Sequence, residues 1–309
     1  KDCKDNSDED DCHVIEVPSS YQKIRFPKKN SISDHPLSLL THILIESINV
    51  IDTMNMNIEL TIRIRIRWTD GRIRLKNLQK NAKSPIPYQV AEKLWLPLDS
   101  IVHDDAMIGK VQQVKNDRRV SVMAVTLPIP VSLDDSFENN LFDPFNNILE
   151  IKQRFRITYI CTFFLKKFPF DNQNCEFRMS INLESNSSLT FTKDLNGVSY
   201  LGPTTINQFE IERITSDTGI DGNDIWFKYK IDMSRLYMNQ IINTIFPTCL
   251  LWLLAYSTLF INIQNFNNRF MGSVTSLLVL ASLLGSIQSG LPKTSYFKYI
   301  DLWFLWYIT

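Results

Sequence analysis

The chain has 309 residues, of which 44% are apolar, and its 33 basic and 33 acidic side chains give a formal net charge of zero. This size is enough to bury a substantial core in two domains. The balanced charge argues neither for nor against a nucleic-acid partner, and we expect none. The sequence shows no nucleophile–base, metal or phosphate motif of an enzyme, and we expect no catalytic activity.

The charges are unevenly distributed along the chain. Arg269 is the only charged side chain between Leu236 and Pro292, whereas the first 235 residues are densely charged. This asymmetry predicts a water-exposed domain at residues 13–235 and a membrane domain at residues 236–309. Four of the five cysteines precede the apolar half, which suits disulfides in an extracellular domain.

Residues 1–12 are acidic and contain Cys3 and Cys12 in the pattern C-x-D-x-S-D-E-x-x-C. This pattern closely resembles the last segment of an LDL-receptor class A module. The resemblance implies calcium ligands at Asp2, Asp8 and Glu9, and disulfides to earlier cysteines. Those earlier cysteines are absent, so either the rest of the module lies upstream or the two cysteines pair atypically; the alternative is a short acidic tail. No signal peptide is present, and we expect a mature or trimmed chain.

Strand patterns dominate the next two hundred residues or so. In Ile58–Trp68, apolar residues alternate with Arg63, Arg65 and Arg67, which predicts one buried face and one basic face. Further strands are expected at Leu40–Val50, Val120–Leu127, Ile151–Cys161, Cys175–Ile181, Phe209–Ile214 and Ile225–Asp232. Turns are expected at Asp70-Gly71, Asn196-Gly197 and Asp221-Gly222-Asn223, and a surface loop at Asp134–Asn147. Many short strands at this spacing predict a β-sandwich.

Cys161 and Cys175 enclose thirteen residues, among them Phe168, Pro169 and Asp171. This arrangement matches the signature of the Cys-loop receptors, the pentameric ligand-gated ion channels. The resemblance implies a disulfide between the two cysteines, which stabilises such a loop by about 3 kcal/mol. It also implies an apolar tip with one carboxylate that presses on a membrane helix. The alternative is an ordinary disulfide-closed hairpin.

Three apolar segments follow. Ile241–Ile263 is long enough to cross a bilayer of about 30 Å as a helix, and Pro247 is expected to kink it. Phe270–Gly290 is expected to be a second span. Tyr299–Thr309 begins a third, and the sequence stops before this segment could cross, so we expect an incomplete membrane domain.

Additional motifs carry the same resemblance in the same order. They are Trp68-Thr69-Asp70, Trp95-Leu96-Pro97-Leu98-Asp99, Arg235 before the first span, Pro247 within it, and residues 291–301, which are most similar to the anion-channel branch. The resemblance implies one subunit of a homo- or heteropentamer in the plasma membrane, with its N-terminal domain extracellular. The implied partners are four other subunits, a small extracellular ligand, permeant ions and the lipid bilayer. Asn186 begins a glycosylation sequon, which agrees with that location.

The resemblance assigns the pore to the second span. Counted at helical spacing from Arg269, one face carries Met271, Thr275, Leu278, Ser282 and Ser286. Leu278 matches the gate leucine of the family, and five copies would close the pore by dewetting; the alternative is that these residues only pack between helices. The residues directly before Arg269 form the portal of the pore and include no carboxylate, so we expect chloride selectivity. Asn267-Asn268 stands where anion channels usually have a Pro-Ala pair. The alternatives are a cation-permeable member of the family and a non-conducting binding or adhesion subunit.

For gating, the resemblance implies a coupling surface between the two domains. Its members would be Asp52, Phe168, Pro169, Asp171, Arg235, Pro292 and Lys293. We expect Asp171 and Arg235 to form a partly buried ion pair.

The ligand-binding segments differ from the aromatic box of many relatives. Asn182 and Glu184 stand where relatives place an aromatic residue, and the hairpin Thr215–Asp224, which includes Asp221, has neither an aromatic residue nor adjacent cysteines. These departures argue against an acetylcholine-type site.

Two other candidates for ligand recognition remain in the sequence. Arg65 aligns with the arginine that binds carboxylates in amino-acid-gated relatives; the alternative is a solvated strand face. His103, beside Asp104 and Asp105, is a candidate sensor of protons or a divalent metal, with an ordinary loop as the alternative.

Overall fold

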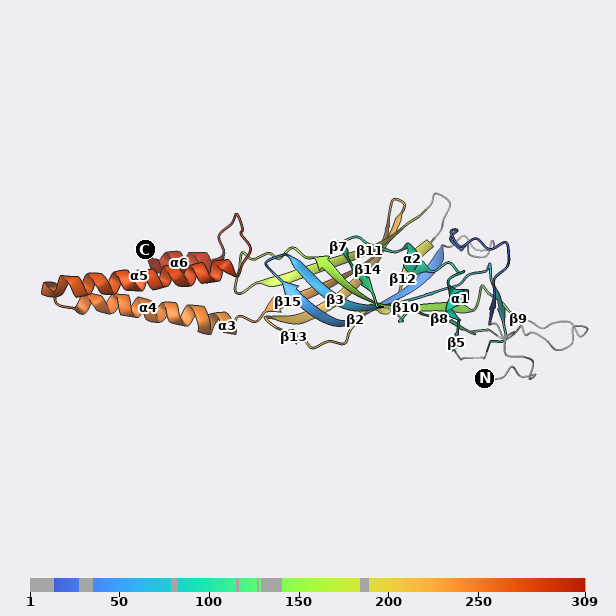
Figure 1. The fold of residues 1–309 in the computed structure, drawn as a ribbon, viewed down its shortest axis with the longest axis horizontal. Helices are drawn as coiled ribbons and strands as arrows, with labels where there is room; N and C mark the ends of the chain where they lie inside the picture. Colours follow the sequence, from blue (N-terminus) through green and yellow to red (C-terminus); the bar gives the residue numbers. More distant parts are fainter. Residues whose placement is uncertain are drawn as a thin grey trace, which may run out of the picture.

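The computed structural model describes residues 14–27, 36–78, 83–114, 117–126, 128, 141–183 and 189–308. These residues form an elongated molecule with β-sheets at one end and long helices at the other (Figure 1). The expected fold class, a β-sandwich followed by helices of the membrane type, is therefore confirmed.

A seven-stranded sheet forms one layer of the sandwich. Its strands run in the order β12-β2-β3-β10-β8-β5, and β7 pairs with the far end of β10. The strands are β2 (Leu37–Asp52), β3 (Asn57–Trp68), β5 (Lys83–Pro85), β7 (Ala106–Gln113), β8 (Arg119–Met123), β10 (Ile148–Ile160) and β12 (Leu189–Tyr200). In β3, every second residue from Ile58 to Trp68 is buried. The alternating pattern of the sequence thus places the apolar face of β3 inside the sandwich.

A five-stranded sheet in the order β13-β14-β15-β11-β6 forms the other layer. Its strands are β6 (Val102–His103), β11 (Asn172–Asn182), β13 (Thr205–Ile206), β14 (Phe209–Asp221) and β15 (Asp224–Arg235). Aromatic side chains fill the space between the layers: the Tyr159 ring of β10 lies 4.5 Å from that of Phe177 and 6.1 Å from that of Tyr229. All three side chains are almost completely buried.

Short elements close the rest of this domain. A small sheet in the order β1-β4-β9 joins Ile15–Glu16, Arg74–Lys76 and Leu141–Phe142, and two short helices, α1 (Tyr88–Ala91) and α2 (Pro97–Ser100), lie between β5 and β6. The disulfide loop, which we define as Cys161–Cys175, connects β10 to β11 and is closed by the expected disulfide.

Two expectations for this domain are corrected. Asn196-Gly197 is not a turn between strands but lies inside β12, where the register with β2 shifts between Lys193 and Val198. The expected hairpin Thr215–Asp224 is present as the paired ends of β14 and β15. Residues 129–140 lie outside the described part of the chain, but the end of the expected surface loop is not a surface loop, since Asn147 is buried and bonded to the backbone of Val125.

The helices begin directly after β15. They are α3 (Met238–Gln240), the π-helical turn η2 (Ile241–Ile245), α4 (Phe246–Ser257), η3 (Thr258–Phe260), η4 (Ile263–Asn265), α5 (Phe266–Ser289) and α6 (Tyr299–Ile308). The π-helical turn ends two residues before Pro247. Proline has no N–H to donate, and its ring collides with the carbonyl four residues earlier. The wider π-helical turn accommodates both effects and takes the place of the expected kink.

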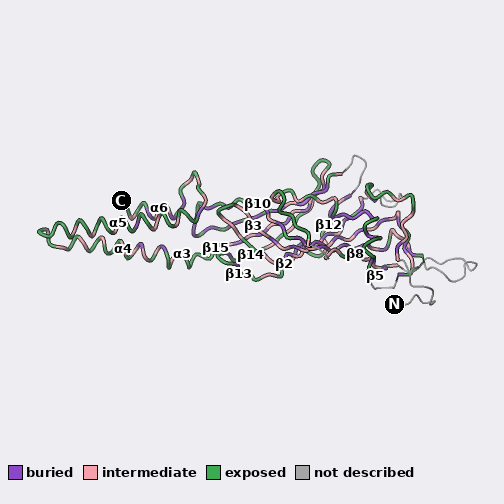
Figure 2. The backbone as a smooth tube through the Cα atoms, viewed as in Figure 1, coloured by how far each residue is buried: buried purple, intermediate pink, exposed green. Residues whose placement is uncertain are grey.

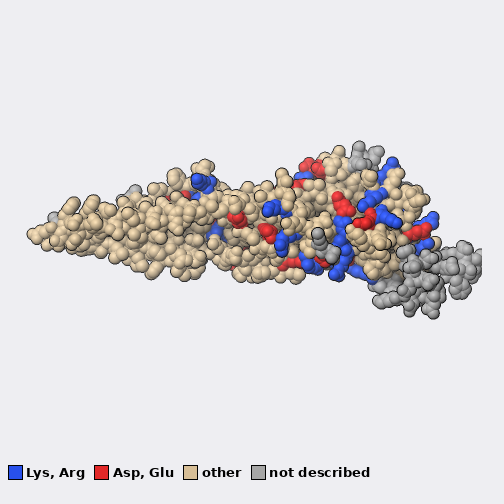
Figure 3. Space-filling model, in the orientation of Figure 1, with Lys and Arg blue, Asp and Glu red and all other residues tan. Residues whose placement is uncertain are grey.

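Two of these helical stretches, Met238–Phe260 and Phe266–Ser289, are long and apolar enough to cross a membrane. In the most apolar 18-residue stretch of each, only 11% and 6% is buried. Figure 2 shows the contrast with the buried strands. In Figure 3 the charged side chains lie almost entirely over the sheets. Because so much apolar surface is exposed without charge, these helices fit a lipid or protein environment rather than water.

Candidate functional site

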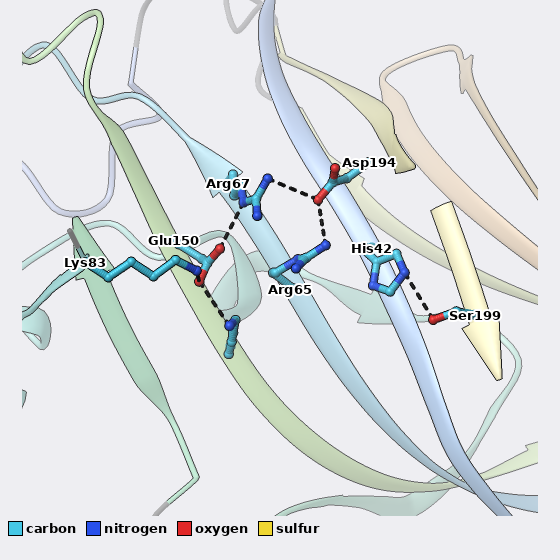
Figure 4. Close-up of polar contacts among 8 residues, drawn as sticks. His42, Arg65, Arg67, Lys83, Glu150, Asp194 and Ser199 are labelled. Carbon is cyan, nitrogen blue, oxygen red and sulfur yellow. Dashed lines mark hydrogen bonds and ion pairs between the residues drawn. The ribbon is translucent and has the colours of Figure 1, made fainter. Parts of the chain in front are cut away.

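The three arginines of β3 lie on the outer face of the seven-stranded sheet, and each meets a carboxylate from another strand, as Figure 4 shows for Arg65 and Arg67. The closest distances are 2.5 Å for Arg63–Glu46, 2.8 Å for Arg65–Asp194, 2.9 Å for Arg67–Glu150 and 3.3 Å for Arg67–Asp194. The face is therefore a network of ion pairs, not the solvated row of free arginines that the sequence left open. The sequence could not show this, because the carboxylates come from β2, β10 and β12.

Glu150 is the most buried carboxylate of this network. Its side chain is 5% exposed and accepts hydrogen bonds from Lys83 at 2.6 Å and from Arg67 at 2.9 Å, with Lys152 at 3.2 Å. Burial alone would raise its pKa, but the hydrogen bonds from Lys83 and Arg67 lower the pKa of Glu150 to about 2. It is thus ionised at any physiological pH.

A cavity of about 730 Å³ opens beside these residues, between α1, β5, β8 and β10. Its acidic lining residues are Glu92, Asp117 and Glu150, and its basic ones are Arg63, Lys83, Arg118, Arg119, Lys152 and Arg154. Glu46, which pairs with Arg63 and Arg154, and Asp99, which pairs with Arg118, lie just outside the lining. Six positive charges thus meet five negative ones, and the small remaining excess of positive charge favours anions. Arg65, the predicted ligand residue, lies on the same face, next to Lys152 across the β3–β10 pair.

His103 is not placed for sensing, which corrects one expectation. It lies in β6 and not in a loop, its ring centroid is 5.8 Å from that of Phe155, and its Nδ1 is 3.0 Å from the hydroxyl of Tyr159. Asp104 and Asp105 bond instead to Ser180 and to the backbone N–H of Arg178. No group of three or more potential metal ligands occurs in the described residues.

We expect the stability of this domain to fall as the pH drops from about 6.5 to about 4. Burial lowers the pKa of His103 to about 4, whereas an unfolded histidine titrates near 6.5. Between these values the unfolded chain binds more protons, so acidification favours unfolding, by up to about 3 kcal/mol. Thermal unfolding of the wild type and of His103→Gln over this pH range checks this. The variant should lose part of the pH dependence, and parallel curves would contradict the assignment.

The predicted ligand residues of the five-stranded sheet lie together at the tip of β14 and β15. Asn182 donates to Asp224 at 2.8 Å, and the exposed Asp221 lies 3.8 Å from Arg178. Trp226, which the sequence analysis missed, lies just beyond the hairpin, with the Lys228 ammonium 4.9 Å from its ring. Since Arg65 and Asp221 are on different sheets, one chain alone does not bring them together.

The ion pair between Asp171 and Arg235 is present and more buried than expected. Arg235 Nε lies 2.8 Å from Asp171 Oδ1 and Nη2 lies 3.2 Å from Oδ2, and the side chains are 2% and 1% exposed. Gln208 accepts a further bond from Arg235 at 2.9 Å, and the guanidinium lies 4.9 Å from the Phe168 ring. The Asp171 carboxylate therefore holds Arg235, the last residue of β15 before the apolar helices, and it does not itself press on a helix.

The disulfide loop contacts the helical domain through backbone and aromatic groups. The Leu165 N–H donates to the Tyr296 hydroxyl at 3.1 Å, and the Tyr299 N–H donates to the Lys166 carbonyl at 3.0 Å. The rings of Phe170 and Tyr237 are 5.1 Å apart. Of these contacts the sequence indicated only the loop and the linker that contains Tyr296.

The other members of the predicted coupling surface lie less directly on it. Pro169, the residue after the cis peptide bond, is buried in the loop. Asp52 accepts bonds from its neighbour Asn55. The Pro292 carbonyl accepts from Lys298 at 3.3 Å, and Lys293 is exposed.

The predicted pore stripe lies on the exposed side of α5. Its members Met271, Thr275, Leu278, Ser282 and Ser286 are all exposed, with Leu278 67% exposed, whereas Leu280 is 5% exposed and packs toward the other helices. Leu278 and Leu280 are two residues apart, so their side chains point in directions about 200° apart around the helix axis. The stripe therefore faces away from the subunit's own helix contacts. Arg269 is partly exposed and lies two residues before Met271.

Several predicted residues lie outside the described part of the chain. They are Asp2, Cys3, Asp8, Glu9 and Cys12 of the N-terminal segment, together with Glu184 and Asn186.

Residues 14–243 match the family model described as the neurotransmitter-gated ion-channel ligand binding domain. The chain is 21% identical to the human gamma-aminobutyric acid receptor subunit rho-3 over 91% of its length and 56% of that protein. It is 22% identical to the acetylcholine-gated chloride channel subunit acc-2 of Caenorhabditis elegans over 93% of its length and 60% of that protein. It is also 22% identical to the glutamate-gated chloride channel of Drosophila melanogaster, over 88% of its length and 56% of that protein. The chain thus spans somewhat more than half the length of these relatives.

Proposed function

Since this chain belongs to the neurotransmitter-gated ion-channel family, we propose that it is one subunit of a plasma-membrane channel that an extracellular ligand opens and that conducts chloride. The observation that carries the proposal is α5, whose exposed stripe is uncharged and follows a portal with Arg269 and no carboxylate. Five copies of Arg269 around one axis raise the potential at the portal and favour anions. Two of the relatives named above are chloride channels, which supports the same selectivity.

The ligand site we propose lies between two subunits. One subunit contributes the arginine face of β3 and its cavity, and the next contributes the tip of β14 and β15 with Asn182 and Asp221. This arrangement explains why a single chain leaves Arg65 and Asp221 apart. The excess positive charge of the cavity favours a small ligand that carries a carboxylate, such as an amino acid.

Recording from cells that express this chain alone tests the function. Amines, amino acids, protons and zinc are applied in turn, and the reversal potential of any evoked current is measured at two external chloride concentrations. We expect the reversal potential to follow the chloride gradient. A reversal potential that follows sodium instead would establish a cation-permeable channel and overturn the proposed selectivity, and the absence of current to every compound would favour a binding subunit that does not conduct.

A further inference from the structure

Asp194 reaches across a strand to hold the two arginines nearest the proposed ligand site. It belongs to β12, which pairs with β2, and β2 pairs with β3, so its carboxylate crosses over β2 to meet Arg65 and Arg67 (Figure 4). Its Oδ2 lies 2.8 Å from Nη2 of Arg65 and 3.3 Å from Nη1 of Arg67, and its side chain is 13% exposed. One carboxylate oxygen thus bridges two guanidinium groups.

The backbone of β12 is distorted where Asp194 lies. Pairing with β2 shifts register directly after Lys193, and the distorted segment, residues 194–197, contains Leu195 at φ 57° and Gly197 at φ 75°. The Cβ of a leucine makes the left-handed region unfavourable, and the Leu195 side chain is 80% exposed, so its own packing offsets little of the strain. Strained positions of this kind are held by their surroundings and occur often at functional sites.

Contacts from β14 hold this segment in place. The Ser216 hydroxyl donates to the Asn196 carbonyl at 2.8 Å, and the Lys193 ammonium donates to the Ser216 carbonyl at 2.6 Å. A side chain at Gly197 would meet the Ser216 hydroxyl at 2.5 Å. The segment is therefore kept in a conformation that presents Asp194 to the arginines.

Arg65 still has an unused donor. Its Nε is buried and has no hydrogen-bond partner among the described residues, and Asp194 engages only Nη2. A guanidinium binds a carboxylate most strongly through two parallel N–H···O bonds, and the internal contact supplies one. A ligand carboxylate that engages two donors has an advantage over Asp194 at the same guanidinium.

We propose that Asp194 is an internal carboxylate that occupies the acid-binding position of Arg65 and is displaced when an acidic ligand binds. The inference rests on the proposed ligand site and deepens it, because it identifies a residue that sets both affinity and specificity. Ligands with a carboxylate compete with Asp194 for Arg65, whereas amines without one gain nothing from its displacement. Asp194 thus determines specificity although it does not contact the bound ligand.

The test compares ligand binding to the purified full chain with Asp194 intact and replaced. In Asp194→Asn, 4-aminobutyrate and L-glutamate should bind at least about tenfold more tightly, the factor that corresponds to ~1.4 kcal/mol, while butylamine binding stays unchanged. Asp217→Asn is the matched control, because Asp217 lies 3.3 Å from Lys193 beside the same segment and makes no contact with Arg65. Adding Arg65→Gln to Asp194→Asn should abolish the gain.

A second variant keeps every charge and tests the same displacement. Leu195→Gly relieves the strain of the left-handed conformation in the state where Asp194 contacts Arg65, and so stabilises that state. Both 4-aminobutyrate and L-glutamate should therefore bind about threefold more weakly to this variant than to the wild type. If neither carboxylate binds Asp194→Asn more tightly than the wild type, or if Leu195→Gly fails to weaken binding, the inference is wrong, even where another ligand opens the channel. Tighter binding to Asp194→Asn without any current supports the inference and counts against the proposed channel function.

Discussion

Replacing Asp171 with alanine should destabilise the protein by about 3–5 kcal/mol, because it leaves the Arg235 guanidinium buried without a counter-charge. Both side chains are at most 2% exposed, and they meet through two hydrogen bonds. Gln208 and the Phe168 ring remain near the guanidinium, but neither supplies a negative charge. Thermal unfolding of the detergent-purified protein and its surface expression measure the effect.

Two further variants separate the buried charge from a general loss of contacts. Arg213→Ala breaks the 3.2 Å pair with Asp232, in which the arginine is 70% exposed, and should cost less than about 1 kcal/mol. Combining Asp171→Leu with Arg235→Met removes both charges and should recover much of the stability lost in Asp171→Ala. An Asp171→Ala protein that is as stable as Arg213→Ala would refute the role given to this pair.

The second large effect is expected in the pore. Leu278→Ser should give a current without ligand, because a ring of five hydroxyls keeps water in a constriction that five leucines would dewet. Leu278 is 67% exposed on the side of α5 that faces away from the subunit's own helices. The measurement is the holding current before any ligand is applied, together with its block by a pore-blocking compound.

Leu277→Ser is the control for this experiment. Leu277 is the adjacent leucine on α5 and lines a small cavity with Trp252 of α4 and Tyr307 of α6, so it lies about 100° away around the helix. The control should change the ligand-free current little. Equal currents from the two variants would mean that the substitution loosens helix packing and does not open a gate.

The sequence predicted the parts of the fold that have strong local signals. The alternation in β3, the spacing of Cys161 and Cys175, and the helices with almost no charged residues each depend on residues close together in the chain. In β12 the local signal was misleading, because Asn196-Gly197 is typical of a turn and here forms a distortion that strand pairing with β2 continues on both sides. Tertiary pairing prevailed over local turn preference.

The site was less predictable because its contacts join distant residues. Arg65 and Asp194 are 129 positions apart, and Leu165 and Tyr296 are 131 apart. His103 shows the same limit in another form: its acidic neighbours in sequence suggested a charged site, but strand alternation turns its ring into the aromatic core. Which face of a strand a residue occupies decides its chemistry, and a two-residue strand carries too short a pattern to show it.

The bond between Tyr299 and Lys166 has a consequence for how the two domains can be studied. The Tyr299 N–H belongs to the first turn of α6, where a helix cannot satisfy its own amides, so the extracellular domain completes the hydrogen bonding of a helix in the other domain. Donor and acceptor are both main-chain atoms, and an alanine substitution at either position leaves the bond in place. Alanine scanning will therefore understate the mechanical connection between the domains, and a change that removes the donor N–H itself, such as an ester in place of the Tyr299 amide or Tyr299→Pro, will measure it.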